Sequence, residues 1–219
     1  AYANESKLSI FRQLPWSKKL EYFREHFLIP AAAAAIIIAL VTFLAVRFIS
    51  PDARPALYAA VVDDALTTSE ATNLQNELED KLGVSVIIDD YFDMDKDGLT
   101  KLQTMLSSKQ IDVIIAPHKI FKQLAGYGYL TNLESTVSKS DNTKLDDATV
   151  QLKGFSDADD DGIDSSGTGK GASKSYGLKL SDATGWTSIA DSDHSALIGI
   201  ATGTKNTGTA QRFIDWLYR

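Results

Sequence analysis

Polar side chains follow two apolar runs, 56–64 and 111–117, that we expect to be buried strands. In an open parallel sheet, ligands bind beyond the carboxyl ends of the strands. The candidate ligand-binding residues are Asp63, Asp64, Thr67, Thr68, Pro117 and His118, with Tyr176 as an aromatic wall. A structural alternative stays open, in which Thr67 or Thr68 caps a helix, His118 lies near a helix N-terminus and Tyr176 packs in the core.

A second group of carboxylates has the spacing that begins an EF-hand calcium loop. In DADDDGIDSSG (157–167), short carboxylates alternate and a glycine stands at the sharp turn. The candidate calcium ligands are Asp157, Asp159, Asp161 and Asp164. Thr168 stands where the loop needs a bidentate Glu, so the segment is either a calcium site or a solvated acidic hairpin. Asp93, Asp95 and Asp97 repeat the beginning, and we expect them to start a helix, whose dipole favours carboxylates there.

No set of residues predicts catalysis. The three histidines are far apart in the sequence, and neither H-E-x-x-H nor G-x-S-x-G occurs. GTGKGAS (167–173) lacks the spacing of a phosphate-binding loop. The chain contains no cysteine, which excludes disulfides, thiol catalysis and a lipidated cysteine. We therefore expect a protein that is not an enzyme and has no catalytic residues.

The elements that would position these groups alternate between strand and helix. Apolar runs at 56–64, 84–92 and 111–117 predict strands, and each is followed by a segment with helical periodicity. The capping box from Thr67 to Glu70 marks the start of the first of these helices. This order predicts an α/β fold with right-handed crossovers and a parallel or mixed sheet that has helices on both faces.

The remainder of this domain is expected to be less regular. Residues 134–194 are rich in Ser, Asp, Gly and Thr and predict hairpins and loops. SALIGIAT (195–202) predicts another strand. A final helix follows from the spacing of Ala210, Phe213, Ile214 and Leu217.

Upstream of the domain, FLIPAAAAAIIIALVTFLAV (27–46) contains no charged residue and is long enough to cross the roughly 30 Å hydrocarbon core of a bilayer. We predict one transmembrane helix over 27–49, retained as an anchor because the apolar run is longer than that of a typical signal peptide. A linker follows at 50–55, and the outer α/β domain occupies 56–219.

The flanks of this helix predict its orientation. Basic residues are more numerous before the helix than just after it, which places the N-terminus in the cytoplasm by the positive-inside rule. Residues 1–26 form a basic segment whose Trp16, Leu20 and Phe23 have helical spacing, so we expect an amphipathic helix at the cytoplasmic lipid surface. Extension of the transmembrane helix or packing on a partner subunit is the alternative.

The outer part is acidic, since Asp and Glu outnumber Lys and Arg after residue 50. Nucleic acid and anionic lipid are therefore poor partners for the domain as a whole. The predicted location is the cell membrane, with the C-terminal domain extracellular or periplasmic.

Two stretches resemble type 2 periplasmic solute-binding proteins. IDVIIAPHKIFKQLAGYGYLTNLES (111–135) resembles their strand, helix and "G-Y-L-x-x-L" turn, and IGIATGTKNTGTAQRFIDWLY (198–218) resembles their returning strand and final helix. The resemblance implies a reduced, membrane-anchored relative of the kind found in some Gram-positive bacteria. It also implies a periplasmic-binding-protein-like sheet.

Taken together, these features predict a single-pass, membrane-tethered recognition module that binds a small solute or peptide. An accessory or scaffold subunit of a membrane complex, such as an ABC-type transporter, is the alternative, and it would bind no small molecule.

Overall fold

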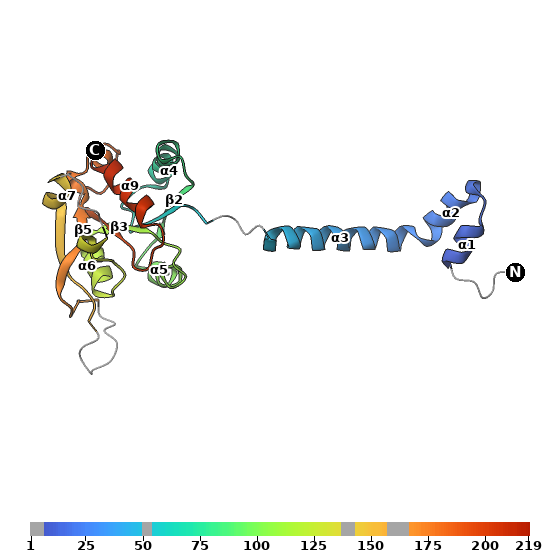
Figure 1. Cartoon of the computed structure of the whole chain (residues 1–219), viewed down its shortest axis with the longest axis horizontal. Coiled ribbons are helices and arrows are strands. Elements are labelled where there is room, and N and C mark those ends of the chain that lie inside the picture. Colours follow the sequence, from blue (N-terminus) through green and yellow to red (C-terminus); the bar gives the residue numbers. More distant parts are fainter. Residues whose placement is uncertain (1–6, 50–53, 137–142, 157–166) are drawn as a thin grey trace. The chain divides into compact units, whose positions relative to one another are not determined.

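The computed structural model describes residues 7–49, 54–136, 143–156 and 167–219 of the 219-residue chain, with the side chains of 7–8, 44–49 and 143–144 left aside. The chain divides into two compact units, Ala1–Ala53 and Arg54–Arg219. Each unit has its own elements, and Figure 1 labels them along the chain.

The first unit consists of three helices, α1 (Lys7–Gln13), α2 (Trp16–His26) and α3 (Leu28–Ile49). Helix α1 was not expected from the sequence. The ring of Phe11 packs near those of Tyr22, Phe23 and Phe27, with centroid separations of 5.8–6.5 Å, and this folds α1 onto α2.

The break between α2 and α3 has a local cause. Pro30 lacks a backbone N–H, and a proline ring clashes with the carbonyl four residues earlier, here that of His26. Helix α2 therefore ends at His26, and the axes of α2 and α3 differ by 66°. By length and composition, no single helix in the described part of the chain is sufficient to cross a membrane. The pair Trp16–His26 and Leu28–Phe43 meets the requirement together, as a bent pair.

The second unit is built on a six-stranded sheet with the order β2-β1-β3-β6-β5-β4. Strands β1, β2 and β3 run parallel to one another, whereas β6 is antiparallel to β3, β5 is antiparallel to β6, and β4 is antiparallel to β5. The strands are β1 (Leu57–Val62), β2 (Val86–Phe92), β3 (Val113–Pro117), β4 (Thr149–Lys153), β5 (Ser173–Lys179) and β6 (Ala196–Ile200). The structure thus confirms the expected α/β class with a mixed sheet.

Helices cover both faces of this sheet. They are α4 (Thr68–Leu82), α5 (Gly98–Ser107), α6 (His118–Gly126), α7 (Thr143–Ala148), α8 (Thr184–Thr187) and α9 (Thr207–Leu217), with short 3₁₀ turns η1 (Leu133–Ser135) and η2 (Leu180–Asp182). In Figure 1, α4 and α9 lie on one side of the sheet and α5 and α6 on the other.

Two apolar cores follow from this layering. Alternate residues of β1 point to opposite faces, so that Ala59 and Val61 pack in one core, whereas Ala60 and Val62 pack in the other. The first core includes Leu74 and Leu78 of α4 and Phe213 and Ile214 of α9. The second includes Leu102 and Leu106 of α5 and Phe121 and Leu124 of α6. Burial on both faces explains the continuous apolar strands of the sequence.

Candidate functional site

The predicted ligand-binding residues at the carboxyl end of β1 build the turn into α4. Asp63 and Asp64 both have left-handed backbones, with φ of 48° and 52°, a conformation that Asp tolerates better than most residues. The Asp63 carboxylate accepts a hydrogen bond from the backbone N–H of Met94 at 2.7 Å. Thr67 forms the predicted capping box with Glu70. The Thr68 hydroxyl donates to the Asp90 carboxylate at 2.5 Å.

The other predicted residues lie in different surroundings. Pro117 ends β3 half-buried, and His118 is the exposed first residue of α6. Tyr176 is half-buried in β5, packs against the second core, and places its hydroxyl beside Gly154. In the structure, the side chains of these residues take part in intramolecular hydrogen bonds or packing, as seen for Asp63, Thr67, Thr68 and Tyr176. Their ligand-binding role stays a prediction.

The predicted calcium ligands Asp157, Asp159, Asp161 and Asp164 lie outside the described residues. Where the chain is described, no group of three or more His, Asp or Glu side chains is placed to hold a metal ion. The similar run before α5 forms a turn, in which a hydrogen bond from the Lys96 ammonium at 2.6 Å lowers the pKa of Asp93. Helix α5 then begins at Gly98, as expected.

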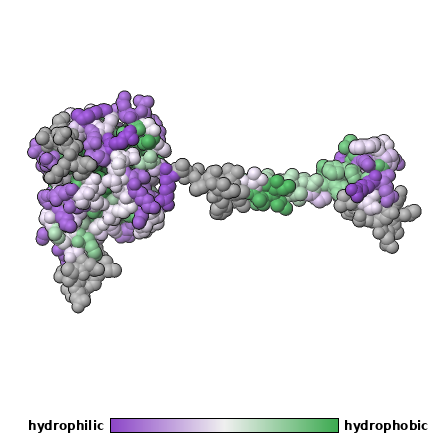
Figure 2. Space-filling view, in the orientation of Figure 1, coloured by the Kyte–Doolittle hydropathy of each residue, from purple (hydrophilic) through white to green (hydrophobic). Residues whose placement is uncertain are grey.

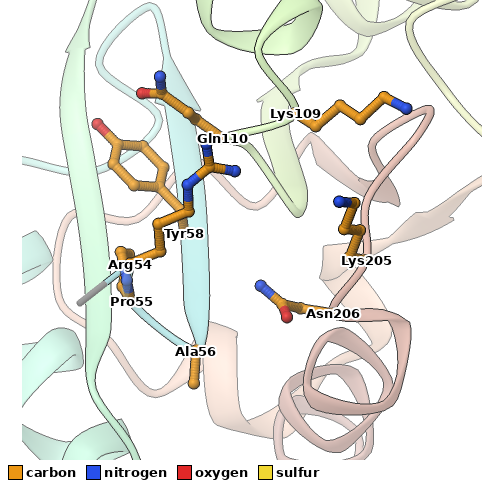
Figure 3. A pocket seen from close by; sticks show the side chains of 8 residues that line it. All are labelled: Arg54, Pro55, Ala56, Tyr58, Lys109, Gln110, Lys205 and Asn206. Atoms are coloured by element: carbon orange, nitrogen blue, oxygen red, sulfur yellow. The ribbon is translucent and has the colours of Figure 1, made fainter. Parts of the chain in front are cut away.

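A pocket of about 390 Å³ opens at the other end of the sheet (Figure 3). Its walls come from the start of β1, from the turn between α5 and β3, and from the loop between β6 and α9. The lining residues are Arg54, Pro55, Ala56, Tyr58, Lys109, Gln110, Lys205 and Asn206. Three of these side chains carry a positive charge, in a unit whose sequence is acidic.

Strand direction explains why these segments meet. Strands β1 and β3 are parallel, so their first residues lie at the same edge of the sheet. Strand β6 is antiparallel to β3 and leaves the sheet at that edge, which brings Lys205 and Asn206 next to the entrances of β1 and β3. Figure 3 shows Arg54 and Tyr58 on one side of the pocket and Lys109, Lys205 and Asn206 on the other.

A buried carboxylate fixes this edge. Asp112, only 2% exposed, accepts hydrogen bonds from the Tyr58 backbone N–H at 2.9 Å and from the Asn206 amide at 3.2 Å, and also from the Thr204 hydroxyl. Asp112 thus joins the three segments that line the pocket. Because buried polar groups are costly when unpaired, this network holds Tyr58 and Asn206 in place.

Among the residues that the structure describes, the three cations at the pocket have no carboxylate partner. Salt bridges in the described part of the chain join Lys81, Lys96, Lys101 and Arg219 to acidic side chains, and none involves Arg54, Lys109 or Lys205. All three are exposed at the pocket mouth. Lys109 adopts a left-handed backbone with φ of 55°, held by hydrogen bonds at the end of α5.

Behind the pocket, Tyr58 belongs to a second polar network. Its hydroxyl donates to Asp89, which also accepts a hydrogen bond from the Lys101 ammonium at 2.7 Å. Burial, followed by the interaction with Asp89, raises the pKa of Tyr58. Burial alone would raise the pKa of Asp89, but hydrogen bonds from Lys101, Tyr58 and the Tyr91 backbone outweigh it and lower that pKa. Tyr58 is therefore a neutral, fixed wall of the pocket at neutral pH.

Sequence reasoning missed this pocket because it placed the ligand at the carboxyl ends of β1 and β3. The direction of β6, which brings Lys205 to the opposite edge, is a tertiary feature that the sequence pattern did not predict. A usable signal did exist, since Arg54, Lys109 and Lys205 stand in segments that flank predicted strands within an acidic domain.

No protein-family model matches the chain, and no curated protein and no solved structure matches it either. Function is therefore argued from the chain's own residues.

Proposed function

We propose that this protein is a single-pass, membrane-tethered extracytoplasmic recognition module that binds a small solute and is not an enzyme. In this proposal, the apolar helix α3, the longer member of the bent pair α2–α3, crosses the membrane over its 22 residues Leu28–Ile49, of which only Leu28–Phe43 counts toward that pair. The unit Arg54–Arg219 carries the binding site. The proposed relationship to type 2 solute-binding proteins belongs to the same hypothesis and rests on the sequence resemblance.

The observation that carries the proposal is the contrast between the two units. Ile36, Ile37 and Ile38 of α3 point in directions about 100° apart around the helix and are 68%, 60% and 65% exposed. The second unit, in contrast, buries most of its large apolar side chains in two cores. Figure 2 shows the hydrophobic surface along the described part of α3. Apolar side chains exposed in every direction around a helix are costly in water and favourable in lipid.

The first two helices support the proposed orientation. Trp16 and Leu20 of α2 are 86% and 81% exposed, and the Lys19 ammonium lies 5.0 Å from the centroid of the Trp16 ring. Exposed aromatic and apolar side chains beside lysines are typical of a helix at a membrane surface. Basic residues on this side of α3 favour a cytoplasmic N-terminus.

The pocket supports recognition rather than catalysis. Its described lining consists of cationic, amide, aromatic and aliphatic side chains. The hydroxyl in that lining belongs to Tyr58 and donates to Asp89, but the raised pKa of Tyr58 disfavours its ionisation and therefore its action as a nucleophile. Its volume of about 390 Å³ lies within the range of roughly 300–1,000 Å³ that is usual for small-molecule sites.

The second candidate is an accessory or scaffold subunit that binds no small molecule. Its support is the alanine run 31–35, which is exposed on α3 and would allow another transmembrane helix to approach closely. In that case the outer unit would dock on the same membrane complex.

A thermal-shift screen of the full chain in a detergent with neutral headgroups separates the two candidates. The library contains amino acids, peptides, sugars, organic phosphates and calcium. The recognition proposal predicts that at least one ligand raises the melting temperature of the outer unit in a saturable manner, because a ligand that binds only the folded state stabilises it. No stabilisation by any library member, together with co-purification of the chain with an integral membrane complex, would contradict recognition and favour the scaffold.

A further inference from the structure

We infer that the pocket formed by Arg54, Tyr58, Lys109, Lys205 and Asn206 binds the phosphate group of a small molecule. This inference rests on the proposed function, because it takes the pocket to be the ligand site and adds the chemical class of the ligand. Neither the sequence pattern nor the comparisons assign a ligand to it.

The first support is the unbalanced charge of the pocket. Arg54, Lys109 and Lys205 come from three separate segments and line the same pocket, and none forms a salt bridge within the described residues. Two carboxylates contact the pocket wall at Tyr58. Asp112 accepts hydrogen bonds from Tyr58, Thr204 and Asn206, whereas Asp89 accepts from the Tyr58 hydroxyl and is paired with the Lys101 ammonium. Because Lys101 balances Asp89, three lining cations against Asp112 leave a net positive site, which favours an anion with two negative charges.

The second support is the helix that begins at the pocket. Asn206 precedes α9, an eleven-residue helix, and makes no side-chain cap hydrogen bond, while its Nδ2 group donates to Asp112. The backbone N–H groups of the first turn therefore have no side-chain acceptor from the cap. Their partial positive charge adds to that of Lys205, which extends from the same loop (Figure 3).

The third support is the shape of the pocket, which indicates an organic phosphate. A volume of about 390 Å³ exceeds that of a phosphate ion alone. Tyr58 and Pro55 supply an aromatic and an aliphatic wall against which the rest of a ligand can pack. A long nucleic acid is a poor candidate, because the unit around the pocket is acidic and would repel it.

In the proposal, the unit that carries the pocket is tethered to the membrane, since only residues 50–53 separate α3 from Arg54 in the sequence. The phosphate therefore has two sources, a lipid headgroup and a free phosphorylated solute, and an experiment can separate them. A lipid headgroup and a free phosphorylated solute offer the same chemistry to the pocket.

The test titrates inorganic phosphate into the full chain in neutral detergent, against sodium chloride at equal ionic strength. Phosphate is expected to raise the melting temperature saturably and to bind in calorimetry, whereas chloride does neither. Lys205→Gln is expected to weaken phosphate binding by at least about tenfold, the usual contribution of a charge-assisted hydrogen bond. The matched control is Lys119→Gln, an exposed lysine on α6 near the opposite edge of the sheet, which is expected to bind phosphate like the parent.

Lys109→Gly separates binding from folding. Glycine adopts the left-handed conformation of position 109 without a steric penalty, so this variant should melt no lower than the parent. It should nevertheless bind phosphate more weakly, because a cation is lost from the pocket. Unchanged phosphate affinity in both Lys109→Gly and Lys205→Gln would overturn the inference.

Two further experiments distinguish a lipid headgroup from a free phosphorylated solute, and phosphate from other ligands. In nanodiscs of phosphatidylcholine the parent should respond to phosphate, and loss of that response in nanodiscs of phosphatidic acid would identify a lipid headgroup as the occupant. An equal response in both would identify a free phosphorylated solute. A neutral sugar or amino acid that stabilises the chain where phosphate does not would overturn the phosphate inference and leave the proposed function standing. No ligand in any class would overturn both.

Discussion

At the scale of single residues, the pocket depends on a few buried or half-buried polar groups rather than on the residues whose types first suggested chemistry. Asp112 joins three segments through its two carboxylate oxygens. Asp63 and Thr67, whose ligand-binding role stays a prediction, form a turn and a helix cap. Residue type and spacing singled out Asp63 and Thr67 but not Asp112, because the hydrogen-bond partners of the Asp112 carboxylate are far from it in the sequence.

Asp112→Ala is expected to destabilise the outer unit strongly. The substitution leaves the Tyr58 N–H and the Thr204 hydroxyl without their acceptor, at a cost of about 1–3 kcal/mol for each buried group. Urea unfolding of the full chain in detergent measures the change. Asp80→Ala, which alters an exposed carboxylate, serves as the control and should stay within about 0.5 kcal/mol of the parent. Equal stability of the two variants would show that the network contributes little.

The network of Tyr58, Asp89 and Lys101 predicts a dependence of stability on pH. The folded structure lowers the pKa of Asp89 below its ordinary value of 3.8. The unfolded chain therefore binds this proton first as the pH falls. The stabilising contribution is present above about pH 4 and is lost at lower pH as the folded carboxylate is protonated.

Asp89→Asn removes this titration. Between about pH 6 and about pH 2.5, the free energy of unfolding of the variant should fall less than that of the parent, and the two should converge at the acidic end. Urea unfolding at both pH values measures the difference. Parallel losses in parent and variant would mean that Asp89 is not stabilised as the charged form.

At the scale of elements, close approach between α6 and the sheet depends on glycines in two strands. A Cβ atom at Gly199 of β6 would lie 2.6 Å from the Tyr176 carbonyl oxygen and 2.7 Å from Cζ of Phe121, and one at Gly177 of β5 would lie 2.6 Å from Cε1 of Phe121. The ring of Phe121 therefore rests on a surface without side chains. This explains why these two strands contain glycine, which usually weakens a strand.

Gly199→Ala is expected to destabilise the outer unit by about 1–3 kcal/mol, because the added methyl group overpacks the contact with Phe121 and a backbone carbonyl. Gly208→Ala is the matched control. A Cβ atom at position 208 would meet nothing within 4 Å, and alanine is the better helix former in α9. The control should be as stable as the parent or more so in urea unfolding. A smaller effect at 199 than at 208 would contradict the packing.

The sequence predicted the positions of the helices and strands of the outer unit better than it predicted which segments lie next to one another in the fold. Periodicity located β1, α4, β2, α5, β3 and α6 in order, and the capping box marked the start of α4. Helix α1 was missed because the ring contacts of Phe11 with Tyr22, Phe23 and Phe27 that fold it onto α2 are tertiary contacts, which the sequence pattern does not show. The pocket was missed for a related reason, since Arg54, Lys109 and Lys205 are far apart in the sequence and meet only through the direction of β6.

At the scale of the whole molecule, the central claim is that two independent units share one chain across a membrane. The exposed apolar side chains of α3 and the two cores of the outer unit support this division. In the proposal, the anchor keeps the outer unit, and with it the proposed phosphate pocket, attached to the membrane.

The chain contains no cysteine, so single-cysteine labelling in right-side-out membrane vesicles tests the central claim directly. Ser17→Cys lies in α2, and Lys174→Cys lies at an exposed position of β5. A membrane-impermeant maleimide should label the Lys174→Cys variant in intact vesicles and the Ser17→Cys variant only after permeabilisation, with both proteins resisting alkaline extraction. Equal labelling of both variants in intact vesicles, or release of the chain by alkali, would contradict the account.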